Sequence, residues 1–161
     1  MRWFKLNCER IKKPAKQVFY LTIQQKKYMN DLTEIKKIIV KKPLKLDCGK
    51  EISNFPLAYE TYGKLNENKD NAILVFHALT GDQFASGINP ITKKDGWWKY
   101  ALGPGKAFDT EKFFVISANV IGGCMGSYGP STINEITSKP LGTDFPVITI
   151  NDMVNAQYNL L

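Results

Sequence analysis

A run of apolar residues that ends at the chain's only histidine constrains the fold more than any other feature. Residues 72–76 read Ala-Ile-Leu-Val-Phe, and His77 opens the turn His-Ala-Leu-Thr-Gly-Asp over residues 77–82. A short unbroken apolar run bounded by polar residues predicts a strand buried on both faces, as parallel sheets require. We therefore expect an α/β protein with functional groups at the carboxyl end of this strand.

Further strands are predicted on both sides of this run. The pattern from Ile38 onward and over residues 52–62 is rich in β-branched and aromatic side chains. Between the two lies the turn sequence Asp-Cys-Gly-Lys at residues 47–50, so a β-hairpin is expected there. Residues 113–120 read Phe-Phe-Val-Ile-Ser-Ala-Asn-Val and predict another strand, which ends in a glycine-rich turn.

One helix is predicted near the end of the sequence. Thr-Ile-Asn-Asp at residues 149–152 forms a capping box with Thr149 as N-cap, so a helix should begin there. Its apolar residues fall at helical spacing and predict one apolar face: Ile150, Met153, Val154, Tyr158 and Leu161. Residues 159–161 carry no C-cap signal, so the chain is expected to stop within the helix.

Positive charge is confined to the N-terminal part of the chain. The net charge is +7, but residues 1–43 hold 12 Lys/Arg against 3 Asp/Glu, and the remaining residues hold 10 against 12. We expect residues 1–37 to be a basic, poorly ordered N-terminal extension and residues 38–161 to be the folded domain. The extension lacks the aromatic interleaving or amphipathic stripe of an arm for nucleic acid or membrane, so neither partner is expected.

Composition argues against several other classes. The three cysteines, Cys8, Cys48 and Cys124, are widely spaced and fit a reducing compartment. No Cys or His pair has metal-ligand spacing, so no metal is expected. No apolar run approaches the ~20 residues of a membrane span, which favours a cytoplasmic location. The Gly-Pro-Gly-Lys sequence at residues 103–106 lacks the spacing of a phosphate loop, so no bound nucleotide cofactor is expected.

A Gly-x-Cys-x-Gly sequence at residues 122–126 offers one candidate nucleophile, Cys124. Its spacing is that of a nucleophile elbow, but an elbow also needs a helix that begins directly after it. Residues 127–130, Ser-Tyr-Gly-Pro, oppose such a helix, and the base would have to be His77. A cysteine hydrolase is therefore an alternative, and a small residue in a tight loop is the favoured interpretation. Gly-x-Ser-x-Gly occurs nowhere in the sequence.

The turn after the central strand has two interpretations. A lone histidine at a strand end is usually a hydrogen-bonded structural residue, which is the interpretation we favour for His77. The following backbone N–H groups could hold an acyl oxyanion, and the Leu79 N–H is the favoured donor. The simpler alternative is a tight strand exit in which Gly81 adopts a positive φ angle.

Six blocks of this sequence resemble, in order, those of the homoserine O-acetyltransferase family. They are His-Ala-Leu-Thr-Gly-Asp (77–82), Gly-Trp-Trp (96–98), Gly-Pro-Gly-Lys (103–106), Asn-Val-Ile-Gly-Gly-Cys (119–124), Tyr-Gly-Pro-Ser (128–131) and Asp-Phe-Pro-Val-Ile-Thr-Ile-Asn-Asp-Met (144–153). Tyr-Glu-Thr-Tyr-Gly at 59–63 extends the resemblance toward the hairpin, and residues 1–28 carry no such block.

The resemblance implies an incomplete α/β-hydrolase domain over residues 38–161. This is the N-terminal part of that fold, a β-hairpin plus the first parallel strands, truncated before the nucleophile elbow. The implied reaction moves an acetyl group from acetyl-CoA to the hydroxyl of L-homoserine, in methionine biosynthesis, through an acyl-serine; homoserine O-succinyltransferase is an alternative. By the same resemblance the Leu79 N–H is the oxyanion donor, and Thr80, Gly81 and Asp82 bind substrate in the wall of the acyl pocket.

The family's catalytic Ser, Asp and His have no counterpart in this sequence. His77 and Cys124 therefore inherit no catalytic role, and the chain alone is expected to be inactive and to need the missing C-terminal portion. The resemblance implies a cytoplasmic homodimer with acetyl-CoA as donor and no bound cofactor. Without the next strand of the family's sheet, residues 73–76 should form an exposed apolar edge, which favours self-association.

Overall fold

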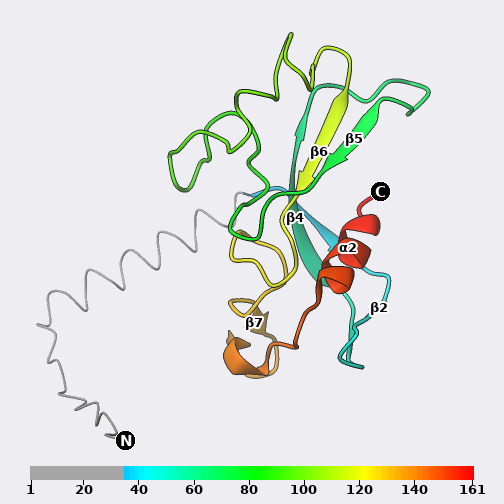
Figure 1. The fold of residues 1–161 in the computed structure, drawn as a ribbon. Helices are drawn as coiled ribbons and strands as arrows, with labels where there is room; N and C mark the ends of the chain where they lie inside the picture. Colours follow the sequence, from blue (N-terminus) through cyan, green and yellow to red (C-terminus); the bar gives the residue numbers. More distant parts are fainter. Residues whose placement is uncertain (1–34) are drawn as a thin grey trace, which may run out of the picture.

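A computed structural model describes residues 35–161, and residues 1–34, most of the expected N-terminal extension, lie outside the described residues. The described part contains a four-stranded mixed sheet, two small hairpins and a helix (Figure 1). Ile35 is buried and Lys37 begins the first strand, so this sheet starts slightly before residue 38.

The central sheet has the strand order β1-β4-β6-β5. Its strands are β1 (Lys37–Val40), β4 (Phe55–Tyr62), β5 (Ala72–Val75) and β6 (Phe114–Ala118). Strand β4 runs antiparallel to both β1 and β6, whereas β5 and β6 are parallel. The apolar runs at 72–76 and 113–120 thus form the expected parallel pair. However, β5 is not buried on both faces as expected, since only Val75 of its four residues is buried.

Two short hairpins and two helical segments complete the described part. The hairpins are β2 (Leu44–Lys45) with β3 (Glu51–Ile52), and β7 (Ile133–Asn134) with β8 (Lys139–Pro140). The helical segments are the 3-10 helix η1 (Gly142–Asp144) and the α-helix α2 (Ile150–Tyr158). The hairpin turn expected at residues 47–50 is confirmed. The single strand expected over 52–62 is interrupted after β3, where Asn54 has a φ of 51°.

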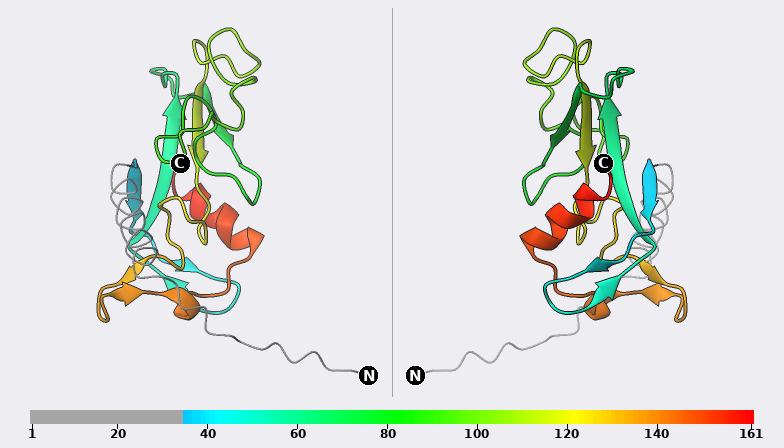
Figure 2. Two further views of the ribbon diagram at one scale, coloured as in Figure 1. Left: turned by 90° about the vertical axis from the view of Figure 1, so that its left-hand side faces the viewer. Right: turned by 90° about the vertical axis from the view of Figure 1, so that its right-hand side faces the viewer.

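Side chains of β4 alternate between two apolar clusters, one on each face of the sheet. Phe55 and Leu57 join a cluster that includes Ala156 of α2. Ala58, one residue further on, packs instead with Phe84 from the loop between β5 and β6. In Figure 2 most of this loop lies toward the top of the molecule and α2 lies lower. The helix and the loop therefore cover different parts of the sheet.

The capping box of α2 is confirmed, but its expected apolar face is not the buried face. The Thr149 hydroxyl accepts from the Asp152 N–H, and the Asp152 carboxylate accepts from the Thr149 N–H. The buried residues of the helix are Asp152, Ala156 and Gln157, whereas Ile150 is 79% exposed and Tyr158 is 71% exposed. Asp152 and Gln157 bond to backbone groups far away in the chain, the Asp47 N–H and the Ala118 carbonyl, and these bonds hold that side of the helix against the rest of the fold.

The helix also ends earlier than expected. Regular α-helix stops at Tyr158, and the Asn159 N–H bonds back to the carbonyl groups of Ala156 and Gln157. Leu161 therefore lies beyond the helix instead of continuing its apolar face.

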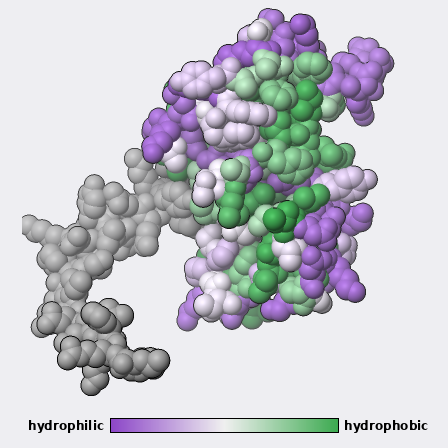
Figure 3. All heavy atoms as spheres, viewed as in Figure 1, coloured by the Kyte–Doolittle hydropathy of each residue, from purple (hydrophilic) through white to green (hydrophobic). Residues whose placement is uncertain are grey.

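The strand β5 lies at the edge of the sheet, as expected. Among the described strands it pairs only with β6. Phe76, directly after it, is 53% exposed, and Ile73 and Leu74 are half-buried. Figure 3 shows apolar side chains gathered on the side of the molecule where β5 and α2 lie. The open edge and the outward face of α2 thus form one apolar surface.

Candidate oxyanion site

A β-turn follows the parallel strand β5 and presents the Leu79 N–H. The Gly81 N–H donates to the Ala78 carbonyl at 2.7 Å, which leaves Leu79 and Thr80 at the two central positions of the turn. The hydrogen bond that closes such a turn does not involve the N–H of its second residue, which is Leu79 here. Within residues 35–161 the Leu79 N–H has no hydrogen-bond acceptor. It is therefore available to a ligand, as an oxyanion donor must be.

His77 is a hydrogen-bonded structural residue in this arrangement. Its side chain is largely buried, with 9% exposed. Its Nδ1 lies 2.7 Å from the Ala78 carbonyl oxygen, and its Nε2 accepts from the Val120 N–H at 3.3 Å. Both ring nitrogens therefore bond to backbone, and neither contacts a nucleophile among the described residues.

Gly81 is required by close packing and not by its φ angle. It is not among the residues with positive φ, so the expectation of a left-handed strand exit is wrong. A Cβ at this position would lie 2.9 Å from the His77 Cβ and 3.1 Å from the Ala78 carbonyl oxygen. Real Cβ atoms essentially never approach another atom to 2.9 Å, so glycine lets the turn fold back against the histidine.

An apolar hollow of about 370 Å³ lies beside the turn. Its walls come from the end of β5, from the turn, from Val120 shortly after β6, and from the helix α2. The lining residues are Phe76, His77, Leu79, Val120, Ile150, Met153, Val154 and Gln157. We call this space the first hollow. It is the place where an acyl group could lie next to the Leu79 N–H.

The three residues expected to bind substrate, Thr80, Gly81 and Asp82, line a different space. This second hollow has a volume of about 220 Å³ and is more polar. Its other lining residues are Phe84, Asn89, Thr92, Lys94, Asp95 and Trp97. The turn therefore separates the oxyanion donor from the residues expected to form the pocket wall, so the two sets face different hollows.

Asp82 organises the wall of the second hollow. Its carboxylate accepts from the Phe84 N–H at 2.8 Å and from the Asn89 side chain at 2.8 Å. Its carbonyl accepts from the Trp97 indole N–H at 2.9 Å. Burial raises the pKa of Asp82 above its ordinary value, and these donors and the nearby His77 oppose that shift. Since both carboxylate oxygens already have protein partners, the role of Asp82 within the chain is to hold this loop.

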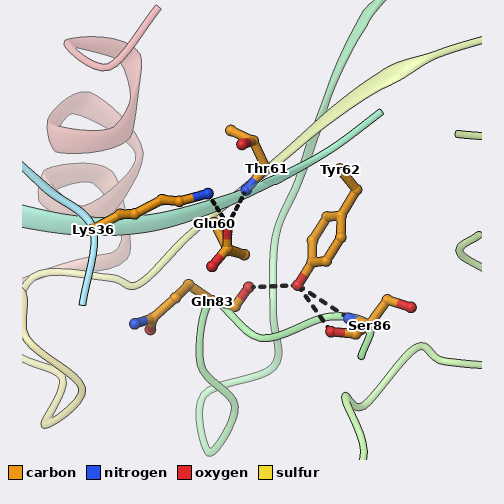
Figure 4. A network of polar contacts seen from close by, with 6 residues as sticks. All are labelled: Lys36, Glu60, Thr61, Tyr62, Gln83 and Ser86. Atoms are coloured by element: carbon orange, nitrogen blue, oxygen red, sulfur yellow. Dashed lines mark hydrogen bonds and ion pairs between the residues drawn. The ribbon is translucent and has the colours of Figure 1, made fainter. Parts of the chain in front are cut away.

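Tyr62 of β4 anchors the segment that follows the turn (Figure 4). Its hydroxyl accepts from the Ser86 N–H at 3.1 Å and lies 3.3 Å from the Ser86 carbonyl and 3.4 Å from the Gln83 carbonyl. Burial raises the pKa of Tyr62 to about 12, so the phenol keeps its proton and can donate to a carbonyl. Tyr62 therefore fixes the segment 83–86 on the central sheet.

Cys124 does not lie in a nucleophile elbow. Strand β6 is followed by turns, and the next regular element is β7, so the helix that an elbow requires does not form. The glycine before it serves packing, since a Cβ at Gly123 would lie 2.6 Å from the Asn119 Oδ1. Cys124 is exposed, and neither hydrogen bond of the His77 ring involves it. The nucleophile elbow on which the cysteine-hydrolase hypothesis depends is therefore not formed at Cys124.

Two residues of the site could not be found from sequence. Gln157 is fully buried, lines the first hollow, and donates from Nε2 to the Ala118 carbonyl at 3.3 Å. Val120 supplies the N–H that His77 binds. A glutamine within an amphipathic helix and a valine at a strand end carry no distinguishing pattern. Both become recognisable only when α2, β5 and β6 are placed together.

Other kinds of site are not formed by the described part of the chain. Within residues 35–161, His, Cys, Asp and Glu side chains form no group of three or more that could hold a metal ion. No helix in the same range has the length and apolar character needed to cross a membrane.

Known proteins of similar sequence and structure define the class. No protein-family model matches the chain. A homoserine O-acetyltransferase from Pelagibacter ubique (strain HTCC1062) is 77% identical over 133 residues, which are 83% of this chain and 36% of that protein. The crystal structure of the Bacillus anthracis homoserine O-acetyltransferase superposes with a TM-score of 0.70 at 33% identity, covering 79% of this chain and 35% of the other.

Esterases are also among the structural relatives. The crystal structure of esterase E22 gives a TM-score of 0.67 at 37% identity and covers 80% of this chain and 36% of the esterase. The strand order, the turn after β5 and these superpositions define the described part as the N-terminal part of an α/β-hydrolase fold.

The similarity to homoserine O-acetyltransferases confirms the resemblance that the sequence blocks indicate. The chain spans about a third of the length of the relatives that it matches.

Proposed function

We propose that this chain is the N-terminal portion of a homoserine O-acetyltransferase. The observation that carries the proposal is the unoccupied Leu79 N–H beside an apolar hollow, in a chain 77% identical to a protein of that name. The complete enzyme moves an acetyl group from acetyl-CoA to the hydroxyl of L-homoserine in the cytoplasm, as a step of methionine biosynthesis. The Leu79 N–H stabilises the negative charge that develops on the thioester oxygen.

Within this proposal the catalytic serine, its aspartate and its histidine are supplied by residues outside this sequence. The apolar surface of β5 and α2 supports that division, because a further strand could pair with the open edge. Buried polar atoms without partners in the described part lie at the end of β6 and on α2. They are Ser117 Oγ, Asn119 Oδ1 and Gln157 Oε1. Such atoms are usually satisfied in a complete fold.

A chimera tests the proposal directly. The matched segment of the Pelagibacter ubique relative is replaced by residues 29–161 of this chain, and release of CoA from acetyl-CoA is measured with L-homoserine as acceptor. The chimera should be active and the 161-residue chain alone inactive. An inactive chimera that is folded, or full activity of the chain alone, would contradict the proposal.

The role of Leu79 is tested in the same chimera. Leu79→Pro removes the N–H from a turn position that tolerates proline, and kcat should fall by about 10²–10³. Leu79→Ala keeps the N–H and changes only a side chain that is 83% exposed, so its loss of kcat should be far smaller. Equal effects of the two substitutions would rule out the backbone donor.

Two other reactions are separated by the same assay. Succinyl-CoA in place of acetyl-CoA tests the succinyltransferase alternative. Hydrolysis of a simple acetyl ester without homoserine tests esterase activity, which the similarity to esterase E22 suggests. The higher identity to the named acetyltransferase favours acetyl transfer to homoserine.

A further inference from the structure

We infer that His77 is the positioning residue of the oxyanion donor: as a neutral imidazole protonated on Nδ1, it ties the Leu79 turn to the end of β6. The inference rests on the proposed function, because it concerns the same Leu79 N–H. It assigns His77 no proton transfer and no contact with substrate.

The two backbone partners of the ring define its protonation pattern. The Val120 N–H can only donate, so Nε2 at 3.3 Å must be an unprotonated acceptor. The Ala78 carbonyl can only accept, so Nδ1 at 2.7 Å must carry the hydrogen. One neutral tautomer satisfies both bonds at once. A free neutral imidazole in solution favours the tautomer with the hydrogen on Nε2. The two backbone bonds therefore stabilise the less common tautomer, with the hydrogen on Nδ1.

The Ala78 carbonyl links the histidine to the oxyanion turn. It accepts from the His77 ring and also from the Gly81 N–H, whose bond closes the turn. Leu79 and Thr80 lie between these two anchor points. The absence of a Cβ at Gly81 lets the turn pack within contact distance of the His77 Cβ and Cγ. Rotation of the ring would therefore displace the turn that carries Leu79.

The other end of the link is held in place by α2. The Gln157 Nε2 donates to the Ala118 carbonyl, two residues before Val120, and Gln157 is fully buried. The first hollow is lined by His77, Leu79, Val120 and Gln157 together. The ring thus connects the segment after β6 with the turn that carries the Leu79 N–H, beside the first hollow.

The ring tautomer can be observed in the chain as it exists. His77 is the only histidine, so a 15N-histidine-labelled sample gives a single set of ring signals. Long-range 1H–15N correlation at neutral pH should show a protonated Nδ1 and an unprotonated, hydrogen-bonded Nε2. An Nε2–H tautomer, or a mixture like that of free histidine, would overturn the inference.

A matched pair of variants then tests the positioning role. His77→Gln places an amide oxygen near the Nε2 position and can still accept from Val120, whereas His77→Asn reaches only the Nδ1 position. Amide hydrogen exchange at Val120, whose N–H bonds to the ring, should accelerate about tenfold or more in His77→Asn and less in His77→Gln. Equal exchange in the two variants, or wild-type exchange in His77→Asn, would contradict the link to Val120.

The same pair in the chimera separates this inference from the proposed function. If both are right, His77→Asn lowers kcat by about tenfold or more with little change in KM, and His77→Gln restores part of it. If the chimera is active and neither substitution changes its kcat, the positioning role is wrong and the proposed function is unaffected. An inactive wild-type chimera with the expected ring tautomer would contradict the proposed function and leave the inferred ring contacts supported.

Discussion

A Cβ atom at residue 81 would collide with the His77 side chain and strain the oxyanion turn. The turn closes through the Gly81 N–H, and its fourth residue lies against the His77 side chain. The glycine is visible in the sequence, but the usual reason for a glycine in a turn, a positive φ, does not apply here. The collision with a side chain four positions earlier depends on how the turn folds back.

Replacing Gly81 by alanine tests this packing argument. The added Cβ would lie 2.9 Å from the His77 Cβ, so the turn or the ring must shift, and we expect a loss of about 1–3 kcal/mol in the free energy of unfolding. Urea denaturation followed by circular dichroism measures it. Thr80→Ala, at an exposed neighbouring position, should change stability by less than about 0.5 kcal/mol.

Tyr62 gives a pH-dependent prediction. Its pKa rises from 10.0 to about 12 on folding, mainly through burial, so the folded chain holds this proton more tightly than the unfolded chain. The associated stability is fully present below pH 10 and is lost as the pH rises toward 12. The unfolding free energy of the wild type should therefore fall more steeply over this range than that of Tyr62→Phe. Parallel curves would contradict the assignment.

The same substitution also removes the acceptor of the Ser86 N–H. At neutral pH Tyr62→Phe should cost about 1–2 kcal/mol, since a partly buried donor loses its partner. Tyr100→Phe is the matched control, because Tyr100 is 84% exposed, and its unfolding free energy should stay close to that of the wild type.

At the scale of elements, the N-terminus of α2 is joined to the β2–β3 hairpin by a buried carboxylate. Asp152 is fully buried, and its two oxygens accept from the backbone N–H groups of Asp47 and Thr149. The Asp47 side chain in turn accepts from the Thr149 hydroxyl at 2.6 Å. The capping box could be predicted from four residues, but its connection to the hairpin, 105 residues earlier, could not.

Substitution of Asp152 by alanine should therefore cost more than the loss of an ordinary helix cap. A helix cap contributes about 1 kcal/mol, whereas two part-buried N–H groups also lose a charged acceptor here, so we expect about 3 kcal/mol. Thermal unfolding followed by circular dichroism measures the loss. Asn155→Ala, on the exposed side of the same helix, should leave stability nearly unchanged. A loss of only about 1 kcal/mol for Asp152→Ala would mean that the link to the hairpin is weak.

At the scale of the whole molecule, an apolar surface runs from the β5 edge to α2. Phe76 is 53% exposed and Ile150 is 79% exposed, although both lie beside the first hollow. Soluble proteins rarely leave such an edge uncovered. The chain is therefore expected to self-associate, or to require a covering strand, when it is present alone.

A charge-matched pair of double variants tests this expectation by size-exclusion chromatography with light scattering. Phe76→Lys with Ile150→Lys should lower the apparent mass at a given concentration, because charge at the edge opposes strand pairing. Ile133→Lys with Ile136→Lys adds the same charge on the β7–β8 hairpin, at residues that are 46% and 94% exposed. Equal effects would indicate that net charge alone matters. A monodisperse wild-type monomer at high concentration would refute self-association.

Sequence patterns alone predict the parallel strands, the turn after residue 76 and the capping box of α2. Each of these depends on hydrogen-bonding and burial patterns within a few consecutive residues. The folded chain was needed to show that α2 buries Asp152 and Gln157, and that Leu79 and Asp82 line different hollows. These features depend on partners far apart in the chain, such as Ala118 for Gln157, and local patterns do not encode such distant contacts.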